Sequence, residues 1–188
     1  MSWFNSLEIL DQKITILLNG SHVTFIDSIM WAVSKPIFGF PFYILFIYLF
    51  FKNYNAKSAF TIILLMGLTV GLGDFIAHEL VKETIQRYRP SHNLEISHQL
   101  NFVNNYKGGQ FGFVSNHATN MTVVGLLTFL FLKKTYPKSW IYLVIFVLTI
   151  SYSRIYLGVH YLSDIFGGWI LGIILSLCSY RIFKNLIS

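Results

Sequence analysis

The sequence predicts an all-α fold, a polytopic transmembrane bundle of five to six membrane helices with an amphipathic helix at the amino terminus. Two observations lead to this prediction. Hydrophobic residues make up 54% of the 188 residues and charged residues only 12%, which leaves too little polar sequence to cover a soluble helical core. The apolar residues also form long runs, and each run approaches the roughly 20 residues that cross a bilayer.

The amino-terminal segment, residues 1–22, is expected to form the amphipathic helix. Apolar side chains recur at three- and four-residue spacing at Trp3, Leu7, Leu10, Ile14 and Leu17. Few cations lie on the opposite, polar face, so we expect this helix to pack on the bundle rather than on anionic lipid. Residues 23–34 are apolar but interrupted by Asp27, and this piece is expected to insert only partly.

The bundle itself is expected over residues 36–184, within a single domain of residues 1–188. Its predicted helices cover residues 36–51, 59–82, 115–133, 139–156 and 162–184. The longest polar stretch, residues 83–114, contains Pro90 and three glycines and is expected to be an ordered surface loop. The single cysteine, Cys178, excludes an intrachain disulfide and a thiolate metal cluster.

The net charge of +6 does not indicate nucleic-acid binding, because no basic run is interleaved with aromatic residues. Lysines instead fill short loops, as cytoplasmic anchors do. Basic residues are equally numerous on the two predicted membrane sides, so the positive-inside rule orients the chain only if some of these cations bind a ligand.

The first of three charged motifs lies at the end of the second predicted membrane helix. It runs from Lys82 to Arg89 and Pro90, and the proline ends the helical path. Asp74 and Glu79, earlier in the same helix, are expected to brace cations inside the bundle. Alone, Lys82 or Arg89 would more often be an interfacial anchor.

The second motif, Val114-Ser115-Asn116-His117, directly precedes a membrane helix. A hydroxyl and free backbone N–H groups at a helix start form an anion site. The third motif lies between the last two membrane helices.

In that third motif, Arg154 and His160 flank a short turn that contains Gly158, and Asp164 follows His160 by four residues. This spacing places the carboxylate and the imidazole on one face of a helix, where Asp164 can hold one ring nitrogen. By itself such a pair is often merely structural.

The predicted topology brings the three motifs to one membrane side. Together they supply three cations, two histidines, a hydroxyl and a carboxylate. Such a set suits a tetrahedral oxyanion, because the cations can stabilise the negative charge on phosphoryl oxygens. One histidine can attack phosphorus while the other protonates the leaving oxygen.

These residues resemble the type-2 phosphatidic acid phosphatase family, whose pattern is K-x6-R-P, then P-S-G-H, then S-R-x5-H-x3-D. The first and third elements match in full over residues 82–90 and 153–164, and the resemblance covers residues 36–184. In the second, Val114 replaces the proline and Asn116 the glycine. Asparagine tolerates left-handed backbone better than most residues.

The resemblance implies a phosphatase that needs no metal or other cofactor. It implies that His160 is the nucleophile and becomes a phosphohistidine, that Asp164 orients it, and that His117 protonates the leaving lipid oxygen. The phosphate-binding residues it implies are Lys82, Arg89, Ser115, Asn116 and Arg154.

The expected partners are a lipid phosphate substrate and membrane lipids. The resemblance is strongest to bacterial enzymes that act on undecaprenyl pyrophosphate; phosphatidylglycerophosphate and lipid A phosphates are the alternatives. The expected location is the bacterial inner membrane, with the site on the extracytoplasmic side. An anion or lipid transporter and an inactive structural membrane protein remain alternatives from other classes.

Overall fold

The computed structural model describes residues 3–20 and 22–186. Residues 1, 2 and 21 of the predicted amino-terminal helix, residues 1–22, lie outside the described residues, as do residues 187 and 188. The described part contains eight α-helices: α1 Trp3–Asn19, α2 Thr24–Val33, α3 Pro36–Asn53, α4 Ala56–Phe75, α5 Glu83–Ile85, α6 Asn116–Leu132, α7 Ser139–Tyr156 and α8 Leu162–Phe183.

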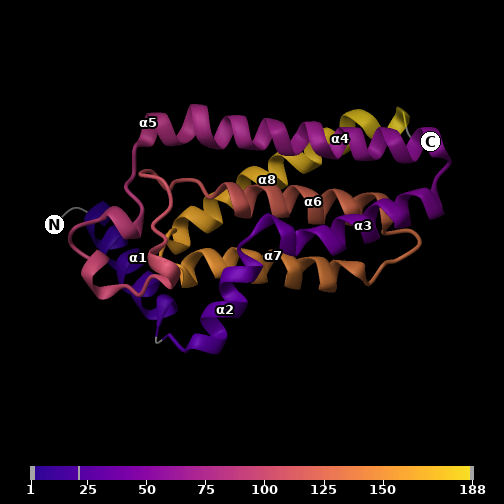
Figure 1. The fold of residues 1–188 in the computed structure, drawn as a ribbon. Helices are drawn as coiled ribbons and strands as arrows, with labels where there is room; N and C mark the ends of the chain where they lie inside the picture. The colour runs from indigo at the N-terminus through magenta and orange to yellow at the C-terminus, as the bar shows by residue number, and fades with distance from the viewer. Residues whose placement is uncertain (1–2, 21, 187–188) are drawn as a thin grey trace.

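Five of these helices run lengthwise beside one another and form the bundle: α3, α4, α6, α7 and α8 (Figure 1). The central helix is α6, which packs against α4, α7 and α8. Among the described residues, four helices are long and apolar enough to cross a membrane, α3, α4 with its continuation to Ile85, α7 and α8, and the bent α1–α2 pair would make a fifth. The predicted polytopic helical bundle is therefore confirmed.

The outer surface of the bundle is apolar, as a lipid-facing surface must be. Large side chains such as Phe40, Leu64, Ile145 and Ile174 are about half exposed or more. The inner faces bury a second apolar set, which includes Phe50, Ile62 and Leu127. Helices that are apolar on both faces belong in a bilayer, where lipid tails cover the outer face.

Two glycines of α8 allow it to lie directly against α6. A Cβ atom on Gly168 would come within 2.7 Å of the Ser115 carbonyl oxygen, and one on Gly172 within 2.7 Å of the Thr119 carbonyl oxygen. Small residues at a helix contact permit this close approach in membrane bundles. The amino-terminal end of α6 is thereby held beside the first turn of α8.

The predicted membrane helices have the expected positions, with small differences at their ends. The largest difference concerns residues 59–82, because this helix begins at Ala56 and continues to Ile85 through a π-helical segment, Ile76–Lys82. The helix stops at Gln86, whose φ of 50° is left-handed. A π-turn often marks a functional position, and here it ends at Lys82.

Helix α1 lies on the bundle with its polar face inward. An amphipathic helix on the core of a soluble protein has the reverse orientation, with its apolar face inward. Thr15 and Asn19 are fully buried, whereas Leu7, Leu10 and Leu17 are more than half exposed. The reason is the solvent, because lipid favours the apolar face and the protein satisfies the polar one.

Helix α1 covers one end of the bundle together with the segment 86–115, which contains three 3₁₀ turns, Pro90–His92, Ser97–Gln99 and Val103–Asn105 (Figure 1). At this end the Asn19 side chain donates to the Tyr156 carbonyl at 2.7 Å and accepts from the Asn101 N–H at 2.8 Å. Helix α5, which ends the continuation of α4, lies at this end of the bundle together with the start of α6, the end of α7 and the start of α8 (Figure 1).

Candidate active site

The covered end of the bundle gathers the charged residues of the three sequence motifs. Lys82, Arg89, Arg154, His160 and Asp164 are all at least 91% buried there, with Asp164 and His160 almost completely enclosed. Charged groups in such surroundings are costly unless they are paired or bind an ion. The predicted convergence of the motifs is thus what the structure contains.

The turn between α7 and α8 presents His160 at the end of the bundle. Gly158 makes this turn possible, since its φ of 70° is left-handed and a Cβ atom there would come within 2.9 Å of the Phe102 ring. Helix α8 then begins at Leu162, and its first turn carries Asp164. The expected pairing with His160 is present, but His160 precedes the helix, so the two residues do not share a helical face.

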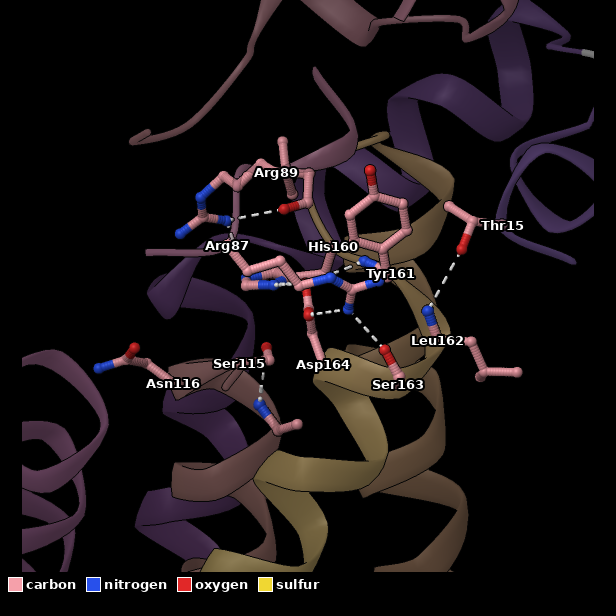
Figure 2. A network of polar contacts seen from close by, with 12 residues as sticks. Thr15, Arg87, Arg89, Ser115, Asn116, His160, Tyr161, Leu162, Ser163 and Asp164 are labelled. Atoms are coloured by element: carbon pink, nitrogen blue, oxygen red, sulfur yellow. Dashed lines mark hydrogen bonds and ion pairs between the residues drawn. The ribbon is translucent and has the colours of Figure 1, made fainter. Parts of the chain in front are cut away.

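The hydrogen bonds around His160 define its tautomer. Its Nδ1 lies 3.1 Å from Asp164 Oδ2, and its Nε2 lies 2.8 Å from Arg89 Nη1 (Figure 2). A guanidinium can only donate, so Nε2 must be the unprotonated nitrogen and Nδ1–H must donate to the carboxylate. Burial, with Arg89 and Arg154 adding to it, lowers the pKa of His160 well below its usual range. The ring is therefore neutral, with the Nε2 lone pair directed at the cations.

Arg89 occupies the centre of the site. Its Nη1 donates to the Val159 carbonyl oxygen at 2.9 Å, and the Gly108 and Gly112 backbone lies against its side chain. Burial and the neighbouring Arg154 lower the pKa of Arg89 to about 10, so the guanidinium still carries its charge at neutral pH. Its buried Nε has no hydrogen-bond partner among the described residues.

Arg154 and Lys82 complete the set of three buried cations. Arg154 Nη1 donates to Ser34 Oγ and Nη2 to the Tyr106 hydroxyl at 3.4 Å, but its buried Nε lacks a partner within the described chain. Lys82 Nζ donates to the Asn116 side-chain oxygen. A bound oxyanion would accept hydrogen bonds from the unpaired N–H groups of these clustered cations.

Asn116 does not point freely into the site. Its amide oxygen accepts from Lys82, and its amide nitrogen donates to Asp74 Oδ1 at 2.7 Å, which also accepts from Asn120 at 3.0 Å. Asp74 thus braces the Lys82 cation through Asn116. The expectation for Glu79 was wrong, since its carboxylate pairs with the exposed His78 at 3.0 Å instead.

Ser115 is the N-cap of α6, and its Oγ accepts from the Ala118 N–H at 3.4 Å (Figure 2). Its backbone N–H, which the sequence suggested as a free anion donor, is taken by the Asp164 carbonyl oxygen at 3.0 Å. The close α6–α8 contact explains this difference. The hydroxyl proton of Ser115 remains the group that could reach an oxyanion.

His117, in the first turn of α6, lies between the cations and an apolar cavity. Its ring contacts the Ser34 backbone and lies in the field of Arg154, Arg89 and Lys82. The cavity has a volume of about 460 Å³, and α3, α4 and α6 line it together with Ser34 and Lys35. A second, smaller and more polar cavity of about 310 Å³ reaches Lys82 and Arg89 from the segment 109–111.

Sequence reasoning missed one residue that contacts the pair of His160 and Asp164. Arg87 Nη1 donates to Asp164 Oδ1 at 2.9 Å (Figure 2). Its Nη2 contacts two carboxylates of α1, those of Glu8 and Asp11. The three carboxylates outweigh the effect of burial and raise the pKa of Arg87 above its ordinary value. The regular alternation of cations at positions 87 and 89 was the available signal.

Among the described residues, no three His, Cys, Asp or Glu side chains are grouped as a metal site would require. The Nε atoms of Arg87, Arg89 and Arg154 are buried donors without a partner among the described residues, and such donors suit an anion.

Comparisons with known proteins agree with the motifs. The sequence model of the PAP2 superfamily matches residues 61–188. Two curated relatives are named lipid A 4'-phosphatase: one from Bacteroides thetaiotaomicron is 33% identical over 87% of this chain and 72% of its own, and one from Porphyromonas gingivalis is 30% identical over 92% and 72%. A relative named undecaprenyl-diphosphatase, from Sulfolobus acidocaldarius, is 29% identical over 88% and 75%.

A solved structure shares the fold. It is described as a transmembrane PAP2 type phosphatidylglycerolphosphate phosphatase from Bacillus subtilis, and it superposes with a TM-score of 0.73 at 22% identity over 96% of this chain and 88% of the other.

Proposed function

The chain belongs to the PAP2 superfamily, and on this premise we propose that it is an integral membrane phosphatase that hydrolyses a lipid phosphate through a phosphohistidine on His160. One observation carries the proposal: the Nε2 lone pair of His160 faces Arg89, while Asp164 holds the opposite ring nitrogen. A neutral, oriented imidazole beside three buried cations suits attack on phosphorus.

In the first step, His160 Nε2 forms a bond to phosphorus as the bond to the lipid oxygen breaks. In the ligand-free site Arg89 donates to the same lone pair, so the phosphoryl group must draw this donor onto its own oxygens before Nε2 can attack. Burial and the nearby cations disfavour a proton on His117 in the ligand-free site, so the phosphoryl charge must offset these cations before His117 is protonated and gives its proton to the leaving lipid oxygen. Arg154, Lys82 and the Ser115 hydroxyl are the remaining candidate phosphate ligands.

In the second step, water attacks phosphorus and the nitrogen–phosphorus bond breaks. His117, now neutral, takes the proton of the attacking water, and phosphate leaves. Asp164 stabilises the positive charge on the phosphorylated ring during both steps. No metal or other cofactor takes part in this scheme, which follows the family resemblance.

The two cavities suit a substrate that is half lipid and half polar. The apolar cavity beside His117 lies on the side where the leaving lipid would be protonated. The polar cavity at Lys82 and Arg89 offers water and released phosphate a separate path. We place the site at the extracytoplasmic surface of a bacterial inner membrane, where it leaves Lys133, Lys134 and Lys138 on the cytoplasmic side.

The substrate proposed first is a lipid A type phosphomonoester, because two relatives with that name align over most of this chain at 33% and 30% identity. The comparisons thus favour one of the sequence alternatives over undecaprenyl pyrophosphate. The latter is kept as the second candidate because the relative named undecaprenyl-diphosphatase aligns over 88% of the chain.

The test is phosphate release by detergent-purified protein in the presence of a chelator, with lipid A, phosphatidylglycerophosphate and undecaprenyl pyrophosphate as substrates. We expect chelator-resistant turnover, fastest on lipid A, and its loss in His160→Ala. Equal release by the variant would refute the nucleophile. Absence of release from every lipid would favour a transporter or an inactive structural protein.

A further inference from the structure

Helix α1 carries two of the eight acidic residues of the chain, Glu8 and Asp11, and both point at Arg87. The lipid outside α1 explains why its polar face turns inward, but it does not explain why both carboxylates meet at one guanidinium. Their side chains are only 36% and 12% exposed, and the Arg87 side chain only 17%. This arrangement has no role in the mechanism as described so far.

The Arg87 guanidinium joins α1 to the catalytic pair. Nη2 donates to both Glu8 oxygens at 3.0 Å and to Asp11 Oδ2 at 2.8 Å, while Nη1 donates to Asp164 Oδ1 at 2.9 Å and to Ser163 Oγ at 2.6 Å. The guanidinium also stacks on Tyr161, 3.9 Å from the ring centre. A planar fork held at both ends has one orientation.

Asp164 depends on this fork. Its Oδ2 accepts from His160 Nδ1 at 3.1 Å and from the Tyr161 N–H at 3.0 Å, which leaves Arg87 as the cation on Oδ1. A carboxylate with no exposed surface needs such a partner to stay charged and to keep its rotamer. Arg87 therefore fixes the group that fixes His160.

The carboxylates of α1 in turn fix Arg87 and its surroundings. Asp11 accepts from the Ser163 N–H at 3.1 Å and from its hydroxyl at 2.5 Å, so it also holds the first turn of α8. We propose that Glu8, Asp11 and Arg87, the α1 clamp, position Asp164 and thereby His160, so that α1 is part of the catalytic machinery. This inference rests on the proposed function, since it assigns the clamp to the same reaction.

The clamp lies at the wall of a cavity, so its residues can be substituted without leaving an enclosed void, and the thermal midpoint reports whether each variant stays folded. Glu8, Asp11 and Arg87 line a cavity of about 630 Å³ between α1 and the start of the 86–115 segment. Shortening Arg87 at this wall therefore enlarges a cavity that water can enter rather than leaving a dry void. Glu8→Gln is the milder change, because it removes a charge at the more exposed end of the clamp and keeps the side-chain length.

The experiment measures kcat, KM and the thermal midpoint of the full-length protein for Arg87→Gln, Arg87→Lys, Glu8→Gln and the double variant Glu8→Gln/Arg87→Gln. Glu95→Gln is the matched control, because Glu95 is exposed and makes no ion pair among the described residues. We expect Arg87→Gln to lower kcat roughly 10- to 100-fold, by analogy with the outer partners of metal-bound histidines, with KM within about threefold. Arg87→Lys should retain more activity than Arg87→Gln.

The double variant tests whether Glu8 affects the reaction only through Arg87. If Glu8 acts through Arg87, adding Glu8→Gln to Arg87→Gln costs no further kcat. Losses that multiply, or an unchanged kcat in folded Arg87→Gln, would overturn the clamp while leaving the proposed phosphatase intact. A wild-type protein that releases no phosphate from any lipid would overturn the proposed function and, with it, the catalytic role of α1.

Discussion

Replacing Asp164 by asparagine tests how the site prepares its nucleophile. In one amide orientation, the oxygen takes the place of Oδ2 and the NH2 group faces Arg87 Nη1, where two donors stand 2.9 Å apart. In the other, the NH2 group faces the Tyr161 N–H and His160 Nδ1, and the ring must turn its proton to Nε2, opposite Arg89. The first orientation has fewer conflicts, so the tautomer is kept and the negative charge is lost.

The magnitude follows from the distance between the two groups. A positive charge on the ring and the carboxylate at 3.1 Å attract by about 5 kcal/mol at an effective dielectric constant of about 20. The hydrogen bond that the amide oxygen retains is worth about 1–2 kcal/mol. The difference of about 3–4 kcal/mol corresponds to a loss of kcat of about 150- to 900-fold. KM should change little, because the side-chain hydrogen bonds of Asp164 go to Arg87, His160 and Tyr161 and not to the proposed phosphate ligands.

The assay is steady-state phosphate release in detergent. Asp27→Asn is the matched control, because Asp27 also pairs with a histidine, His22 at 2.9 Å, but outside the cation cluster. We expect this control to keep kcat within about twofold. An Asp164→Asn enzyme with a kcat within threefold of wild type would show that the carboxylate does not stabilise the reacting ring.

Three further predictions concern the cavity, the pH dependence and the lysine brace. Gly67 lines the apolar cavity and Gly71 does not, and a Cβ atom on either meets nothing within 4 Å. Gly67→Leu should therefore lower kcat/KM for long-chain lipids about tenfold, because the lipid loses about ten atom contacts, and it should leave kcat/KM for a short-chain phosphate unchanged. Gly71→Leu is the control and should change neither value. The pKa of His160 is lower in the folded protein than in the unfolded chain, so only the unfolded state takes up this proton as the pH falls. When the pH is lowered beneath about 6.5, the thermal midpoint should therefore decrease, and it should decrease less in His160→Gln. Parallel curves for the two proteins would refute the buried neutral ring. Asn116→Leu should raise KM at least tenfold by freeing Lys82 from Asp74, and an unchanged KM would exclude this brace.

The motifs could be predicted from the sequence because their chemistry is local or follows from topology. The four-residue spacing of His160 and Asp164 fixes their pairing within one turn, and long apolar runs fix which helix ends share a membrane side. Lys82, Arg89 and Arg154 were therefore expected to converge, and they do.

The partners of these residues could not be predicted, because they depend on how the helices pack. Arg87 reaches Glu8 and Asp11 across 79 and 76 positions of the chain. The inward polar face of α1 follows from the lipid outside it, and the pairing of the Ser115 N–H follows from the glycine contact between α6 and α8. The periodicity of α1 shows that the helix is amphipathic but not which face turns inward, and the contact between α6 and α8 leaves no periodic signal.

The most direct test of the account is to trap the covalent intermediate. Protein mixed with radiolabelled lipid phosphate and quenched in alkali, where a nitrogen–phosphorus bond survives, should carry the label on His160. With a lipid pyrophosphate as substrate, whose phosphate leaving group needs little protonation, the label should accumulate in His117→Gln because the second step lacks its base. The label should be absent in His160→Gln. A label on another residue, or turnover retained by His160→Gln, would contradict the account.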